Sequence, residues 1–181
     1  FRYGTPEKVG GWNQLGESKL TGAARALHHM VSKTSIKYAI IGTNRILYAY
    51  TGGVYYDIHP LVNPSGTAIT NAFTTTNGED EVTITFAGAH GFVAGDIILF
   101  GGSGTFTSIT NSDYTASDFA DTKYMVTSVP TSTTITITMA TDETGSGATT
   151  SGGITYYRYY SVGPAEQIGA YGFGISLYGG N

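Results

Sequence analysis

Short runs of alternating hydrophobic and polar positions recur along the chain, and this period of two predicts β-strands. In the first third, strand-like runs occupy 36–42, 45–51 and 54–60, and the last of them alternates. Thr43-Asn44 and Gly52-Gly53 separate them, and residues of these types favour tight turns. The pattern therefore predicts consecutive antiparallel strands.

The run 54–60 shows the alternation most clearly, with Tyr55, Asp57 and His59 on one face and Val54, Tyr56 and Ile58 on the other. Residues 23–32 are ambiguous, because the first half of this stretch contains good helix formers. Their short length and β context favour a strand. Residues 23–60 then form four strands, a β-meander of the size of one propeller blade.

A second region begins after Asn63, where the composition changes to Thr, Ser, Gly and Asp with almost no Lys or Arg up to Gly153. Runs at 81–87, 96–101, 123–129 and 133–140 resemble strands, and their apolar positions would line one small barrel or sandwich. The Gly-Ser-Thr stretches at 101–112 and 142–153 favour loops.

The last segment opens with an aromatic strand at 156–160 and closes with aromatic-glycine pairs. We therefore predict an all-β protein in which residues 1–63 and 154–181 form discontinuous, propeller-blade-type β segments. Residues 64–153 form an inserted Thr/Gly-rich β-barrel or sandwich domain. Because the chain starts at Phe1 without Met and ends in a glycine-rich run, we expect it to be part of a longer protein.

The composition agrees with strands and turns. The 181 residues include 26 Gly and 14 Tyr, only 12% are charged, and 40% hydrophobic content suffices for a packed core. The net charge of −4 and the scattering of nine Lys and Arg argue against a general nucleic-acid-binding surface. The absence of Cys excludes disulfides, thiolate zinc sites and cysteine nucleophiles. No apolar stretch reaches the roughly 18 to 20 residues of a membrane span, so no membrane partner is expected.

Candidate metal ligands are poorly placed. His28 and His29 are neighbours and would point to opposite faces of a strand, while His59 and His90 lie in different predicted domains. The acidic residues of the loop at 113–121 lack the alternating spacing of a calcium loop, so a solvated loop is favoured. We predict no cofactor and no metal site.

Candidate catalytic groups are also missing from the sequence pattern. Glu79-Asp80-Glu81 is contiguous and lies where a polar turn enters a strand, unlike a separated pair of glycosidase carboxylates. Gly101-Gly102-Ser103-Gly104 lacks the ending of a phosphate loop, and no serine elbow is present. The prediction is that the chain is not an enzyme.

The tyrosines and Trp12 could form a sugar-binding platform, although such side chains more often fill a β core or a subunit interface.

Four segments, taken in order, resemble the tail tubular protein B, or tail nozzle, family of short-tailed, podovirus-like bacteriophages. They are RYGTPEKVGGWNQL (2–15), AIIGTNRILYAYTGGVYYDIHPL (39–61), AHGFVAGDIILFGG (89–102) and YGFGISLYGG (171–180). The third segment also resembles small β-barrel modules that phage proteins of this type insert into a propeller. Members of this family are several times longer than this chain.

The resemblance implies a virion structural protein of the phage tail. Its subunits would form a homo-oligomeric ring that retains DNA and lets it pass without sequence-specific binding during ejection. Neighbouring partners would be the tail adaptor or connector and the fibre proteins. A mildly acidic lumen would suit the passage of DNA. The expected subunit-interface residues are Trp12, Tyr157, Tyr159, Phe173 and Tyr178.

Two other classes of function stay open. A carbohydrate- or receptor-binding tail module would use the dense aromatic residues and the weak charge. A capsid decoration or head-fibre protein would share the Thr/Gly-rich strand composition.

Overall fold

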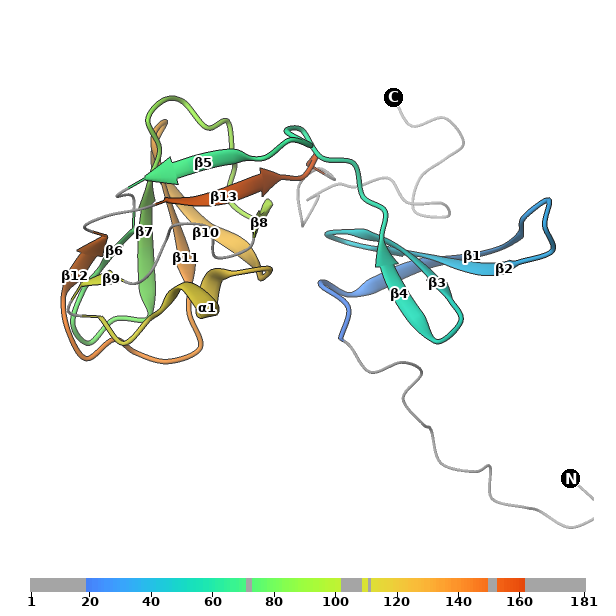
Figure 1. Cartoon of the computed structure of the whole chain (residues 1–181), viewed down its shortest axis with the longest axis horizontal. Coiled ribbons are helices and arrows are strands. Elements are labelled where there is room, and N and C mark those ends of the chain that lie inside the picture. The colour runs from blue at the N-terminus through green and yellow to red at the C-terminus, as the bar shows by residue number, and fades with distance from the viewer. Residues whose placement is uncertain (1–18, 71–72, 102–108, 111, 150–152, 162–181) are drawn as a thin grey trace, which may run out of the picture.

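The computed structural model describes residues 19–70, 73–101, 109–110, 112–149 and 153–161 (Figure 1). These residues form strands in two antiparallel sheets, and they contain one short helix, α1 (Ala116–Phe119). The predicted all-β fold is confirmed.

The first sheet is a four-stranded meander in the order β1-β2-β3-β4. Gly52 and Gly53 connect β3 to β4 with φ angles of +58° and +88°, the left-handed conformations that a two-residue hairpin of type I′ requires. The predicted meander is thus present, and its strands are β1 (Ala24–Val31), β2 (Lys37–Thr43), β3 (Leu47–Thr51) and β4 (Val54–Asp57).

The ambiguous stretch at 23–32 is a strand, as expected. β1 pairs with β2 in a register that joins Leu27 to Ile41 and Val31 to Lys37. This ladder outweighs the modest helix propensity of the Ala-rich start. Every residue of β1 is nevertheless exposed, so pairing along one edge, rather than burial, holds the strand in place.

The second sheet, here the barrel sheet, has nine strands in the order β5-β13-β8-β10-β11-β7-β6-β12-β9 and curls around one core (Figure 1). The four strands predicted from strand-like runs are neighbours at its centre: β7 (Glu81–Thr85), β8 (Ile97–Phe100), β10 (Lys123–Thr131) and β11 (Thr134–Thr138). The remaining strands are β5 (Thr67–Thr70), β6 (Phe73–Thr75), β9 (Ile109–Thr110), β12 (Gly147–Thr149) and β13 (Gly153–Arg158).

The core of the barrel sheet follows the predicted alternation. Val82, Ile84, Ile135 and Ile137 are completely buried, and full burial of such a side chain contributes about 1.5–3 kcal/mol. Helix α1 closes one side of the core with Phe119, whose ring centroid lies 4.8 Å from that of Phe73. The barrel sheet therefore has its own hydrophobic core.

Two local expectations differ from the structure. β12 and β9 lie within stretches for which the composition predicts loops. Strand β13 covers the start of the predicted blade-type segment at Ile154, but it pairs with β5 and β8 in the barrel sheet. Three of its ladder partners, Ile69, Ile98 and Phe100, are apolar and buried, which explains the placement. The domain boundaries at 63/64 and 153/154 stay a prediction.

Candidate functional site at the junction of the two sheets

One chain segment connects the first sheet to the barrel sheet, and the segment that leaves the barrel after β13 pairs with it. The outgoing segment follows β4, the returning one follows β13, and Leu61 forms a β-bridge with Tyr159. The amide of Val62 donates to the carbonyl of Arg158 at 2.7 Å, and the amide of Tyr160 donates to the carbonyl of Pro60 at 3.1 Å. The connection is a short two-stranded ladder instead of a single linker.

An apolar cluster fills the space beside this ladder. Ile46 and Tyr48 come from the first sheet, and Ile97 and Tyr159 come from the barrel sheet and its exit strand. All four are buried, with Tyr159 only 4% exposed. The two sheets therefore share a second, smaller hydrophobic core, which we call the junction.

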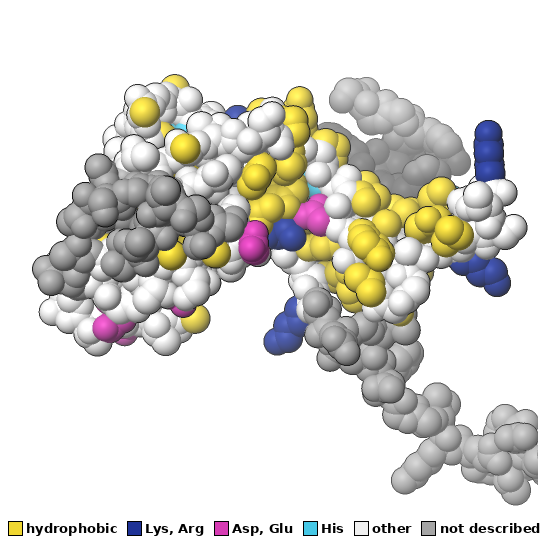
Figure 2. Space-filling model, viewed as in Figure 1, with side chains coloured by type: hydrophobic (Ala, Val, Ile, Leu, Met, Phe, Trp, Pro, Cys, Tyr) yellow, Lys and Arg dark blue, Asp and Glu magenta, His cyan; other side chains and the backbone are white. Residues whose placement is uncertain are grey.

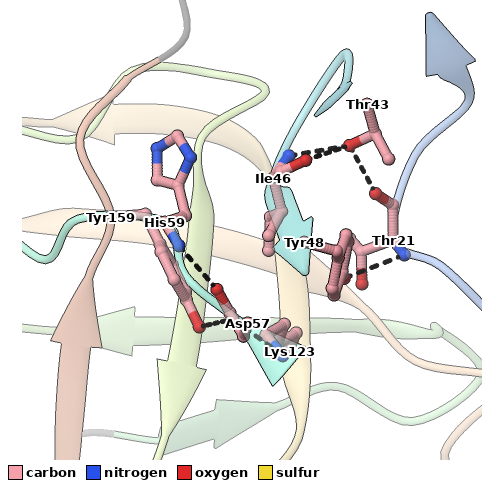
Figure 3. A network of polar contacts seen from close by, with 8 residues as sticks. All are labelled: Thr21, Thr43, Ile46, Tyr48, Asp57, His59, Lys123 and Tyr159. Atoms are coloured by element: carbon pink, nitrogen blue, oxygen red, sulfur yellow. Dashed lines mark hydrogen bonds and ion pairs between the residues drawn. The ribbon is translucent and has the colours of Figure 1, made fainter. Parts of the chain in front are cut away.

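The carboxylate of Asp57, at the end of β4, is the centre of the polar contacts at the junction (Figure 3). It accepts a hydrogen bond from the Tyr159 hydroxyl at 2.5 Å and one from the backbone amide of His59 at 3.0 Å. Lys123 of β10 places its Nζ 3.1 Å from the same carboxylate. One side chain of the first sheet thus binds two side chains of the barrel half.

Burial of its phenol raises the pKa of Tyr159, and the hydrogen bond to the negatively charged Asp57 raises it further. Both effects disfavour the phenolate. Tyr159 therefore stays a neutral hydrogen-bond donor, which is the state that the contact with Asp57 requires.

Two further contacts close the junction on its other side. Arg45, in the turn between β2 and β3, donates from a guanidinium nitrogen to the carbonyl of Gly95. The Nε2 atom of His59 lies 2.8 Å from the carbonyl of Tyr160. The turn that carries Arg45 is itself fixed by Thr43, whose hydroxyl accepts from the amide of Ile46 at 2.8 Å and donates to the carbonyl of Thr21 at 2.8 Å (Figure 3).

A buried carboxylate also organises the far end of the barrel. Glu143 is 2% exposed and accepts hydrogen bonds from the Ser112 hydroxyl and, at 2.6 Å, from the amide of Asp113. The Tyr114 hydroxyl donates to the carbonyl of Thr141 nearby, and burial, followed by the charge of Glu143, raises the pKa of Tyr114. These groups satisfy one another and fix the loop before α1.

Two of the five expected subunit-interface residues, Tyr157 and Tyr159, lie within the described part of the chain. Tyr159 lies inside the junction of a single chain, so it has an intramolecular packing role. Tyr157 is half-buried on β13, where its ring would meet a Cβ atom added at Gly66 or Gly101. Trp12, Phe173 and Tyr178 lie outside the described residues. A role in subunit contacts stays a prediction.

Sequence-based reasoning misses Asp57, Lys123 and Arg45. The only signal is the alternation in 54–60, which places Asp57 on the same face as Tyr55 and His59. That face turns toward the junction, while Val54, Tyr56 and Ile58 are exposed. Hydrophobicity alone predicts that the face with Val54, Tyr56 and Ile58 is the buried one, which is the opposite of what the structure shows.

The four histidines do not converge. His90 is buried in a barrel turn, where its Nδ1 accepts from the amide of Phe92 at 2.9 Å, whereas His59 lies at the junction. Among the residues that the structure describes, no group of three or more His, Asp or Glu side chains is arranged to hold a metal ion. Over the same residues, no helix is long and apolar enough to cross a membrane.

Comparisons with known proteins give little similarity. No protein-family model and no curated protein matches the sequence. The solved structure of "Phage phi92 endosialidase" is similar over 76% of this chain and 19% of its own, with 20% sequence identity and a TM-score of 0.42. The chain thus corresponds to about a fifth of the length of that protein.

This comparison corrects one expectation. The sequence pattern predicts that the chain is not an enzyme, whereas the similar solved structure is that of an endosialidase, which is an enzyme. The exclusion of enzymatic activity is therefore withdrawn.

Proposed function

We propose that the chain is a segment of a bacteriophage tail protein and that its first sheet is an assembly surface. The observation that carries the proposal is β1, an eight-residue strand whose residues are all exposed although it contains Leu27, Met30 and Val31. Among the described residues β1 is an edge strand, and an edge strand of this length with apolar side chains is a template for pairing or packing. The resemblance of four sequence segments to the tail nozzle family supports the location in the tail.

The narrower form of the proposal is a nozzle subunit. It would form a homo-oligomeric ring with the tail adaptor on one side, and viral DNA would pass through it. The barrel half favours this role because its charge is negative, and like charge keeps DNA from adhering to a channel wall. The junction contributes by holding barrel and first sheet in a fixed relation, so that a force on one is transmitted to the other.

Detection in phage particles tests the proposal. Antibodies against residues of the barrel should label the tail in negative-stain electron microscopy of particles whose genome encodes this chain. Label on the head, or absence of the chain from purified particles by mass spectrometry, would contradict it. Label confined to the tips of the tail fibres would contradict the nozzle role and favour the receptor-binding module described next.

A carbohydrate- or receptor-binding tail module is the second candidate. Tyr56 and Tyr160 are 52% and 57% exposed, and the half-buried Tyr50 and Tyr55 have ring centroids 4.8 Å apart. Exposed aromatic rings pack against sugar faces. Binding on a glycan array that is lost in Tyr56→Ser would favour this candidate, whereas an array without signal would count against it.

A further inference from the structure

The charges of the chain, which look scattered in the sequence, divide between its two halves. Residues 19–62 carry five Lys or Arg against one acidic residue, a net charge of +4. Residues 63–161 carry two against nine, a net charge of −7. Figure 2 shows Lys and Arg side chains at the end of the molecule that the first sheet forms, and Asp and Glu side chains at the far end of the barrel.

The basic end is the β1–β2 hairpin. Lys33 and Lys37 are exposed at its tip, and Arg25 is exposed further along β1. Beside them lie the apolar side chains of Leu27, which is 71% exposed, and Val31. This surface combines positive charge with hydrophobic area, and within the described residues nothing covers it.

The acidic end is formed by the β6–β7 turn and the segment after β11. Glu79 and Asp80 lie in the turn, Glu81 begins β7, and Asp142 lies in the segment after β11. Backbone bonds hold the two segments together: the amide of Met139 donates to the carbonyl of Asp80 at 2.8 Å, and that of Glu143 to Glu79 at 2.9 Å. Among the described residues, these four carboxylates form no ion pair.

We propose that the β1–β2 hairpin of one copy docks on the acidic barrel end of a second copy, head to tail. Two first sheets would repel each other, and so would two barrels, because each pair brings together charges of the same sign. Only the unlike ends attract. The inference rests on the proposed assembly function and adds the partner and the two surfaces that meet.

The positions of the two ends determine the symmetry of such a contact. They lie at opposite ends of the long axis, so one copy cannot satisfy its own charges (Figure 2). A contact between two different surfaces is heterologous, and it generates a closed ring or an open filament, depending on the rotation between copies. The docking also covers Leu27 and Val31, which removes apolar surface from water.

Sedimentation velocity of the whole chain at low and high salt is the first test. At about 0.01 M salt, where charges act over about 30 Å, oligomers larger than dimers are expected. At about 1 M salt, where the range is about 3 Å, they should dissociate. A chain that is monomeric at low salt, or oligomers that salt leaves intact, would overturn the proposal.

Charge-reversed variants identify the surfaces. K33E/K37E and E79K/E81K should each be monomeric at low salt, because each variant cancels the net charge of one end, residues 19–62 in the first and the four acidic positions of the barrel end in the second. A one-to-one mixture should form dimers, since the E79K/E81K variant keeps the basic hairpin and the K33E/K37E variant keeps the acidic barrel end. Lys19→Glu is the matched control, because Lys19 precedes β1 at the end opposite the hairpin, and it should still assemble. Circular dichroism checks that all variants are folded.

Two other results would contradict the inference. Oligomers that persist in both double variants would show that another surface is used. A parent chain that stays monomeric yet binds a short DNA duplex, with binding lost in K33E/K37E, would identify a polyanion as the partner of the basic end. Tail labelling in phage particles is independent of these results, so the proposed location and the head-to-tail contact can fail separately.

Discussion

Among single residues, Tyr159 joins the two halves most directly, because its hydroxyl donates to Asp57 and its ring lies in the junction core. Tyr159→Phe removes the hydrogen bond but keeps the ring. A hydrogen bond to a charged group contributes about 1.5–3 kcal/mol, and we expect a loss toward the lower value because the Asp57 side chain is 22% exposed. Urea unfolding measures the change.

The matched control is Tyr160→Phe. Tyr160 is the next residue, is 57% exposed, and uses its backbone carbonyl, not its hydroxyl, to contact His59. The free energy of unfolding of the Tyr160→Phe variant should differ from that of the parent chain by less than about 0.5 kcal/mol. Equal losses in the two variants would show that the contact between Tyr159 and Asp57 adds no stability.

The raised pKa of Tyr159 predicts a specific alkaline sensitivity. Burial and the charge of Asp57 favour the protonated phenol in the folded state, whereas the unfolded residue titrates near pH 10. The folded state therefore binds more protons above about pH 10, and its stability falls as the pH rises toward the folded pKa. Below about pH 10 this contribution is fully present.

Chemical denaturation across about pH 9 to 11 should show a steeper loss of stability in the parent chain than in Tyr159→Phe. Tyr114 and Tyr124 also have raised pKa values, so the variant should lose only part of the slope. Parallel curves for the two proteins would contradict the assignment to Tyr159.

Among the elements, the turn that leads into β5 depends on Gly66. Its φ angle is +70°, and a Cβ atom added there would lie 2.3 Å from Thr155 Cγ2 on β13. Gly78 has a similar φ of +81° but nothing within 4 Å of an added Cβ. Replacing each by Ala separates the strain of the backbone from the steric overlap.

Both Ala variants should lose about 1–2 kcal/mol from the left-handed backbone. Gly66→Ala should lose about 1–3 kcal/mol more, because Thr155 and Tyr157 must move. Thermal or urea unfolding of the two variants provides the comparison. Equal destabilisation of the two variants would mean that the side chains of Thr155 and Tyr157 move aside at little energetic cost.

In the barrel sheet, the strands that the hydrophobic pattern predicts are those at the centre. Val82 and Ile84 of β7, or Ile135 and Ile137 of β11, are buried because neighbours cover them on both sides, so hydrophobicity marks them. Strands β9 and β12 have two and three residues and are rich in Thr and Gly. They are strands because neighbouring strands pair with them, and they are too short to show a periodic hydrophobic pattern in the sequence.

The junction could not be predicted for a related reason. Asp57 contacts Lys123 and Tyr159, which are far from it along the chain, and nothing local marks either as its partner. In the sequence, Glu143 is likewise indistinguishable from a solvated acid, although it is buried and hydrogen-bonded. The contacts of Asp57 form because the segment after β13 runs beside the segment after β4. This arrangement depends on the topology of the whole fold and not on the local sequence.

At the scale of the whole molecule, two cores of unequal size are joined through few contacts. The barrel has a continuous core around Phe73, Phe100 and Phe119, whereas the first sheet contributes Ile46 and Tyr48 to the small junction cluster. Because local stability follows buried apolar contact, the first sheet should open at a lower free energy than the barrel.

Hydrogen exchange measures this hierarchy. Amides of β1 and β4 should exchange faster than those of β7, β10 and β11, which lie at the centre of the barrel sheet. Asp57→Ala, which removes the carboxylate shared by Tyr159 and Lys123, should further speed exchange in β4 and leave β7 and β11 unchanged. Asp142→Ala is the control, since Asp142 is exposed and far from the junction, and it should affect neither. If Asp57→Ala accelerates β11 as much as β4, the two halves unfold as one unit, and the expected order of opening is wrong.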